Sequence, residues 1–324
     1  MDGVTLLPRA RRASRVIALV TAVAGPVVPR LFPGIAGQRV QQGLVLGALA
    51  LGMPHGASDT ELLTRAAHGD RRRHAALLLG YAGLAAGSTA VVRRGGPWVE
   101  RAVLVASAAH FSEGELACWG AAPKGAARRR TALRAVAAAT TSVLLPAAVG
   151  HANRRPAEVG ANAALEITTA VRAASEHSGL WLLRKGSRTV ALPALAAAVA
   201  TAGLAASGDR EAARDSALLL ALDLLAQPSS AFAAYFGGWH ALRHTARVVD
   251  ALVAEGQLPE QRSLPGAIVT LGRRSAWAAG VGLLGAGALA LKDPAHASDN
   301  AFAAVLGLTV PHMTTVAAEL SARR

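Results

Sequence analysis

The most constraining feature of this chain is a series of ten apolar segments, each close to the length of about 20 residues that crosses a bilayer. Short loops that contain Gly, Pro, Arg and Asp separate the segments, as expected where a chain turns in water. The predicted spans are 16–36, 41–57, 75–92, 97–117, 133–150, 161–183, 189–206, 215–240, 275–291 and 299–320. No long linker divides them, so residues 1–324 are predicted to form a single integral membrane domain. The fold class is all-α: a polytopic transmembrane bundle of eight to ten spans.

Composition agrees with a membrane protein and excludes one other class. Hydrophobic residues make up 52% of the chain and charged residues 17%, which is too apolar for an ordinary soluble domain. The net charge of +14 would suit nucleic acid, but the arginines lie between apolar stretches. Only five Trp, five Phe and two Tyr are present to stack on bases. Nucleic-acid binding is therefore not expected.

The arginines predict the orientation of the chain. If the N-terminus lies inside, the loops that become cytoplasmic carry clusters such as Arg71–Arg73 and Arg128–Arg130, whereas the opposite loops carry at most two basic residues each. This bias follows the positive-inside rule for an even number of spans. We therefore expect a multi-pass protein of the cell membrane with both termini cytoplasmic. Segment 161–183 is the weakest span because it contains Glu166, Arg172 and Glu176; if it lies along the surface, the later topology inverts.

Histidines at membrane depth are candidates for function, because ionisable groups are costly there. His55 ends the second predicted span, and Asp59 follows one helical turn later, where its carboxylate could orient the imidazole. A solvent-exposed helix cap would give the same pattern. His110 lies within the fourth span, and Glu113 shares its helical face.

The strongest local motif closes the eighth span. His240 and His244 are separated by four residues, so one helical face presents both imidazoles and both can bind one metal. His312 follows Pro311 inside the tenth span and could be a ligand, a substrate contact or a proton carrier.

Topology predicts that these five imidazoles meet. Spans two, four, eight and ten would all run from outside to inside, which places their histidines at one level in the cytoplasmic half. Imidazoles suit iron, zinc, copper and nickel, so the residues alone leave the metal open. The chain has one Cys, no Gly-rich phosphate loop and no Gly-x-Ser-x-Gly motif, which removes support for iron–sulfur, nucleotide and serine-hydrolase chemistry.

At these motifs the chain resembles the Brp/Blh family of bacterial and archaeal β-carotene 15,15′-dioxygenases. The resemblance is spread over most of the chain and is carried by Pro54–Asp59, His110–Glu115, Trp239–His240 with His244, and Pro311–Met313. It implies a membrane enzyme in which ferrous iron and dioxygen split the central double bond of β-carotene into two retinal molecules. A retinal acceptor such as a rhodopsin is the partner that this reaction implies.

The resemblance also implies roles for particular residues. The implied iron ligands are His55, His110, His240 and His244. The accompanying residues with less defined catalytic roles are Asp59, Glu113 and His312. The neighbours that could hold the polyene are Phe111, Tyr235, Phe236, Trp239 and Met313. A lipid-soluble carotenoid could reach such a site sideways from the membrane lipid.

Three alternatives remain at this point. The chain is rich in Ala and Arg and poor in aromatics for this family, so the substrate could be a shorter apocarotenoid or another polyene or lipid. A metal-ion transporter would place histidines at several depths. A desaturase or hydroxylase would need more histidine boxes than the one His-x-x-x-His in this chain.

Overall fold

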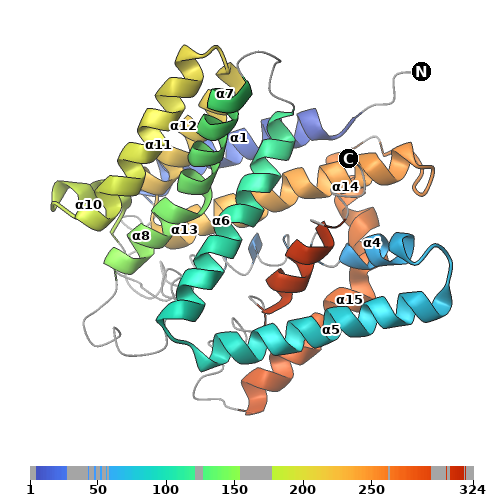
Figure 1. Ribbon diagram of the computed structural model, residues 1–324. Coiled ribbons are helices and arrows are strands. Elements are labelled where there is room, and N and C mark those ends of the chain that lie inside the picture. The colour runs from blue at the N-terminus through green and yellow to red at the C-terminus, as the bar shows by residue number, and fades with distance from the viewer. Residues whose placement is uncertain are drawn as a thin grey trace.

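The structure is a computed structural model in which the described part of the chain is helical (Figure 1). It describes residues 5–27, 58–120, 127–153, 177–261, 263–292 and 307–316, together with the single positions 43, 47, 48, 52, 56, 304 and 318. No strand occurs within these residues. The predicted all-α fold class is therefore confirmed for this part of the chain.

The described helices occur in the following chain order. Those of the first half are α1 (Leu7–Ala24), α4 (Asp59–Ala66), α5 (Arg71–Arg94), α6 (Pro97–Trp119), α7 (Ala127–Ala139), the π-helix η1 (Thr140–Leu144) and α8 (Leu145–Ala152). Those of the second half are α10 (Gly179–Arg184), α11 (Arg188–Ala206), α12 (Arg210–Leu225), α13 (Pro228–Ala233), the π-helix η4 (Ala234–Ala241), α14 (Leu242–Ala254), α15 (Leu264–Lys292) and an unlabelled helix at 307–316.

Local sequence explains the start and end of α5, which matters for the site. Asp70 caps its N-terminus by accepting hydrogen bonds from the backbone N–H groups of Arg72 and Arg73. At the other end Gly95 and Gly96 have φ values of 66° and 108°, a backbone conformation that side chains disfavour. Pro97 then starts α6. These signals produce the sharp corner between α5 and α6 in Figure 1.

Helix α1, partly hidden behind α6 and α7 in Figure 1, packs against α12, η4 and α14. Its buried residues are all small and spaced by four: Ala10, Ser14, Ala18 and Ala22. Such a stripe lets helix backbones approach closely, as small residues do between helices in membranes. The alanine-rich composition is therefore used for close helix packing.

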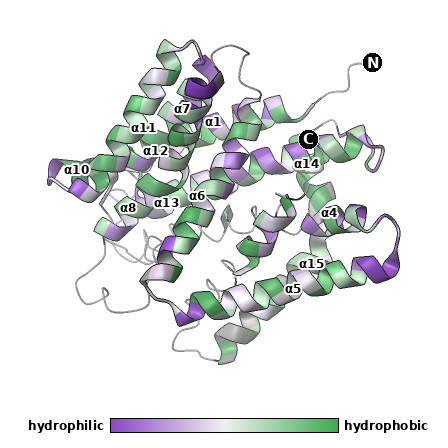
Figure 2. Ribbon diagram, viewed as in Figure 1, coloured by the Kyte–Doolittle hydropathy of each residue, from purple (hydrophilic) through white to green (hydrophobic). Residues whose placement is uncertain are grey.

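The large apolar side chains of several helices point outward instead. On α1, Val20 and Val23 are 56% and 66% exposed, and on α5 Leu79 is 74% exposed. Figure 2 shows hydrophobic, green turns interspersed with polar ones along α5 and extensive green ribbon on α11. Among the described residues, three helical stretches are long and apolar enough to cross a membrane: Arg71–Arg94, Arg128–Ala152 and Arg188–Ala206. These features indicate association with a membrane, since a water-soluble surface rarely exposes so much apolar area.

Several predicted boundaries need correction. Segment 215–240 is not one helix, because α12 ends at Leu225 and Pro228 starts α13 after two extended residues; proline favours an extended residue before it and the first turn of a helix after it. Helix α1 begins at Leu7 rather than at 16, so its arginines are helical. Helix α15 begins at Leu264 rather than at 275. Ser263 caps this start, because its hydroxyl accepts a hydrogen bond from the Gly266 N–H. Most of 41–57 and of 161–183 lies outside the described residues.

Candidate functional site: a cluster of imidazoles

Four histidines from three distant segments of the chain meet in the interior. The ring centres of His110 and His312 are 4.9 Å apart, those of His110 and His240 5.5 Å, and those of His244 and His312 5.6 Å. His240 and His244 are 6.1 Å apart. All four are buried, with 3% to 8% of their surface exposed. The fifth predicted member, His55, lies outside the described residues.

A stretch of π-helix positions His240. Residues Ala234–Ala241 form η4, which continues into α14 with His244 in its first turn. π-helical turns are rare and frequently occur at functional sites. Gly237 and Gly238 permit this segment to pack tightly, since a Cβ at Gly237 would lie 2.8 Å from the Cα of Ala48 and one at Gly238 2.7 Å from Ile17. Gly237 and Gly238 therefore allow neighbouring segments to pack closely against this π-helix.

Asp59 orients His312. The Nδ1 atom of His312 lies 2.9 and 3.0 Å from the two carboxylate oxygens of Asp59. Tyr81 of α5 donates its hydroxyl to the same carboxylate at 2.8 Å. A carboxylate oxygen accepts hydrogen bonds, so this contact fits the tautomer of His312 that carries its proton on Nδ1. The sequence predicted an orienting role for Asp59 towards His55, which lies outside the described residues; among the described residues the carboxylate contacts His312.

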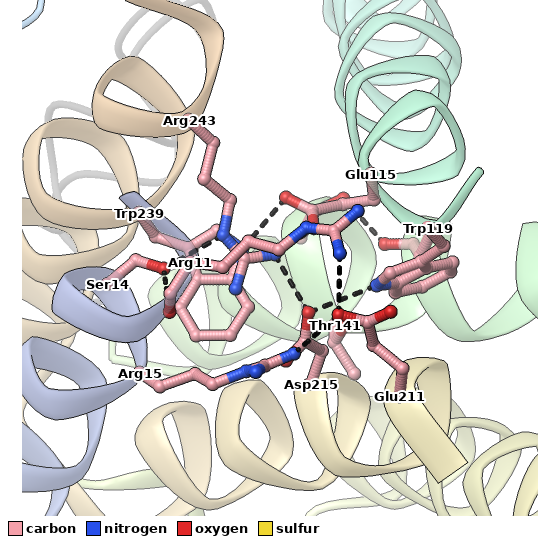
Figure 3. Close-up of polar contacts among 12 residues, drawn as sticks. Arg11, Ser14, Arg15, Glu115, Trp119, Thr141, Glu211, Asp215, Trp239 and Arg243 are labelled. Atoms are coloured by element: carbon pink, nitrogen blue, oxygen red, sulfur yellow. Dashed lines mark hydrogen bonds and ion pairs between the residues drawn. The ribbon is translucent and has the colours of Figure 1, made fainter. Parts of the chain in front are cut away.

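A buried ionic network, shown in Figure 3, includes Trp239 and Arg243, the neighbours in sequence of His240 and His244. Arg243 is 1% exposed and its Nη1 lies 2.9 Å from Asp215 and 3.3 Å from Glu115. Its guanidinium also lies over the ring of Trp239 at 3.6 Å, and its Nε donates to the Ser14 hydroxyl at 2.8 Å. Trp239 donates its indole N–H to Glu115 at 2.9 Å. The network therefore joins α1, α6, α12 and the η4–α14 segment.

The network extends towards the surface along α1 and α12. Arg15 binds Asp215 at 2.6 Å and Glu211 at 3.1 Å, and Arg11 binds Glu211 at 2.7 Å. Trp119 donates to Asp215 at 3.2 Å. Buried charges persist when they are paired and hydrogen-bonded in this way. Because Trp239 and Arg243 precede His240 and His244 directly, the network holds the segment that carries both imidazoles.

The predicted polyene-binding residues fall into two groups. Phe111 and Tyr235 lie at the cluster: the Phe111 ring is 4.6 Å from that of His240 and 5.5 Å from that of Tyr235. Phe236 instead stacks on Phe232 with ring centres 5.5 Å apart. The remaining two are Trp239, fully buried in the ionic network, and Met313, half-buried next to His312. Substrate binding by any of the five stays a prediction.

Glu113 and Glu115 differ in burial. Glu113, the predicted acidic residue of the motif, is half-buried, whereas Glu115 is 1% exposed and reaches Trp239 and Arg243. Sequence analysis also missed Tyr81 and Arg243. The only local signal for them was polarity within a predicted span or at its end, because their partners come from helices far away in the sequence.

The donor set suits a transition metal. Rings that share one ion, at about 2 Å per metal–nitrogen bond, have centres roughly 5 Å apart, which is close to the separations in the cluster. Within the described ranges, which leave out His55, no group of three or more His, Cys, Asp or Glu side chains is arranged to hold a metal ion. The fit therefore rests on the kind of donor and on the ring separations.

Gly114 provides a test of this geometry. A Cβ at Gly114 would lie 3.2 Å from Cε1 and 3.4 Å from Nδ1 of His240. We expect Gly114→Ala to lower activity by about tenfold or more by displacing this ring, while the helix itself gains up to about 1 kcal/mol from the better helix former. Gly83→Ala is the matched control, since a Cβ there meets no described atom within 4 Å. We measure the activity and the melting temperature of both variants in detergent. Only Gly114→Ala should lose activity while its melting temperature rises.

Comparison with known proteins identifies the family. The family model described as beta-carotene 15,15′-dioxygenase matches residues 46–318, which include all twelve site residues predicted from the sequence. No curated protein and no solved structure gives a significant match. The family model covers most of the chain and all four histidine motifs. The chain therefore belongs to the β-carotene 15,15′-dioxygenase family.

Proposed function

We propose that this protein is an iron(II)-dependent dioxygenase that splits the 15,15′ double bond of β-carotene to give two all-trans-retinal molecules. The observation that supports this best is the convergence of His110, His240, His244 and His312 in a member of the carotenoid dioxygenase family. The predicted transporter would spread its histidines over several depths. One compact cluster favours the enzyme.

The proposed ligands of the iron are His55, His110, His240 and His244. Iron held by these residues would supply the redox chemistry needed for the reaction of dioxygen with the polyene. The chain's own residues orient and shield this site. Asp59 fixes the ring of His312, and Phe111 and Tyr235 provide apolar edges beside His240. Burial of all four described imidazoles keeps water away from the reacting carbons.

The proposed setting is the cell membrane, in a single integral domain with about ten spans and both termini in the cytoplasm. Three helices of suitable length and the outward-facing valines and leucines support this arrangement. A carotenoid dissolved in lipid could then diffuse to the site without a soluble carrier. The released retinal would pass to an acceptor such as a rhodopsin.

Purified protein in detergent tests the proposal. We expect one iron per chain, and two retinal molecules for each β-carotene and dioxygen consumed. Retinal should not appear under argon or after chelation, and it should return when iron(II) is added but not when zinc is added. Two irons per chain would indicate a desaturase-like enzyme, and dioxygen-independent metal uptake into vesicles would indicate a transporter. Cleavage of an apocarotenoid in place of β-carotene would correct the substrate.

A further inference from the structure

A cavity of about 760 Å³ lies next to the imidazole cluster, between α4, α5 and the helix at 307–316. Its walls are mainly aliphatic and include Leu62, Leu63, Leu77 and Leu84. The volume falls within the range of roughly 300–1,000 Å³ that is usual for small-molecule sites. In Figure 1 these walls are α4, α5 and the red helix in the centre of the molecule.

The inner end of the cavity borders the candidate site. Tyr81 and Pro311 both line it. Tyr81 donates its hydroxyl to Asp59, which holds Nδ1 of His312, and Pro311 directly precedes His312. A molecule in the cavity therefore has its inner end one side chain away from the Asp59–His312 pair.

The outer end of the cavity is basic and lies near the start of α5. Arg65, His68 and Arg73 line it there, and Arg65 pairs with Glu255 at 2.6 Å. Arg73 and Leu84, which mark the extent of the lining on α5, are eleven residues apart in the sequence, or about 16 Å along a helix. This length suits a slender apolar molecule such as half of a carotenoid.

Helix α5 gives the cavity a side that faces lipid. Helix α5 is long and apolar enough to cross a membrane, and only 6% of its apolar stretch is buried inside the protein. Leu84 of the cavity wall is itself 40% exposed. Hydrocarbon dissolved in the bilayer can therefore reach the aliphatic lining past α5. Apart from the basic residues, the polar side chains of the lining are Tyr81, Gln257, Thr314 and Thr315, and the hydroxyls of the two threonines donate to the Pro311 carbonyl of their own helix.

We propose that this cavity binds one retinal-length half of the carotenoid, with its ring towards the basic end and its central double bond towards the imidazoles. The proposal rests on the proposed function. It makes Gly80, Leu77 and Tyr81 determinants of which carotenoid end is accepted, and it couples an occupied cavity to His312 through Tyr81 and Asp59.

Gly80 allows the cavity to be filled without disturbing the fold. It lines the cavity, and a Cβ there meets no described atom within 4 Å. Gly80→Phe places a ring in the space, and the graded variants Gly80→Ala and Gly80→Val fill less of it. Gly83→Phe is the matched control, because Gly83 lies on the same helix, is equally open and does not line the cavity.

The experiment measures β-carotene binding under argon, from the shift of its visible absorption in detergent, and KM for β-carotene in air. We expect Gly80→Phe to raise both Kd and KM by about tenfold or more, with the iron content unchanged, and Gly83→Phe to change them by less than about twofold. The Ala and Val variants should give increases in order of size, which also covers a Phe variant that does not fold.

The outcomes separate the two proposals. Normal binding and KM in Gly80→Phe, with wild-type protein that cleaves β-carotene, would overturn the cavity proposal and leave the function in place. Wild-type protein that binds but does not cleave β-carotene, with binding lost in Gly80→Phe, would support the cavity and overturn the function. Equal losses in the Gly80→Phe and Gly83→Phe variants would overturn the cavity proposal, because the effect would then be general to α5.

Discussion

Replacing His240 by alanine should abolish retinal formation and remove most of the iron from the purified protein. His240 lies within the cluster, 5.5 Å from His110 and 6.1 Å from His244 between ring centres, and 3% exposed. Loss of a residue that merely orients a metal ligand costs about 10- to 100-fold in affinity or activity, so loss of a ligand should cost at least about 100-fold. Iron per chain and retinal formed per minute are the two measurements.

Two comparisons make this result specific. His151→Ala should leave both quantities within about twofold, because His151 is exposed at the end of α8. Asp59→Asn should give an intermediate loss of about 10- to 100-fold, since it keeps the size of the group that holds His312 but removes its charge. Full iron content and normal turnover in His240→Ala would show that the cluster is not the metal centre.

Replacing Arg243 by methionine should destabilise the protein more than any other single change in the ionic network. Removal of one partner from a buried ion pair typically costs about 3–5 kcal/mol, because the remaining charge stays buried without compensation. Arg243 joins Glu115, Asp215 and Ser14 and covers the face of Trp239. The free energy of unfolding in detergent, from the denaturant midpoint, should fall accordingly.

The matched control for this prediction is Arg274→Met. Arg274 pairs with Glu61 at 3.1 Å but is 37% exposed, and exposed pairs contribute about 1 kcal/mol or less. Combining Arg243→Met with Glu115→Gln should restore part of the loss, because the double variant no longer buries an unpaired Glu115. Equal effects of Arg243→Met and Arg274→Met would mean that burial does not make this network important for stability.

The sequence was informative where the signal is local. The apolar segments 75–92, 97–117 and 189–206 correspond to α5, α6 and α11, because length and composition alone define a long apolar helix. The spacing of His240 and His244 likewise depends only on adjacent turns, although the π-helix that precedes His244 could not be foreseen. The break at Pro228 was missed because apolar stretches continue on both sides of the short polar sequence Gln227–Ser230.

The ionic network could not be predicted from local patterns. Arg11 and Arg15 look like the charged flank of a first span, yet they lie in α1 and bind Glu211 and Asp215, about 200 residues away in the chain. Choosing Glu115 over Glu113 requires knowing where α14 packs. Tyr81 gives no signal until α5 lies beside Asp59. Each of these contacts depends on tertiary packing, which helical periodicity in the sequence does not reveal.

The stripe of Ala10, Ser14, Ala18 and Ala22 on α1, with Val20 and Val23 facing outward, has a consequence for how this protein can evolve. In water-soluble proteins most interior positions require apolar residues, whereas surface positions vary freely in polarity. Here the tolerance is inverted: the periphery can exchange Val, Leu and Ile at little cost, whereas a single added methyl group on the stripe must push α12 or α14 aside. Divergence in this lineage should therefore gather on the lipid side.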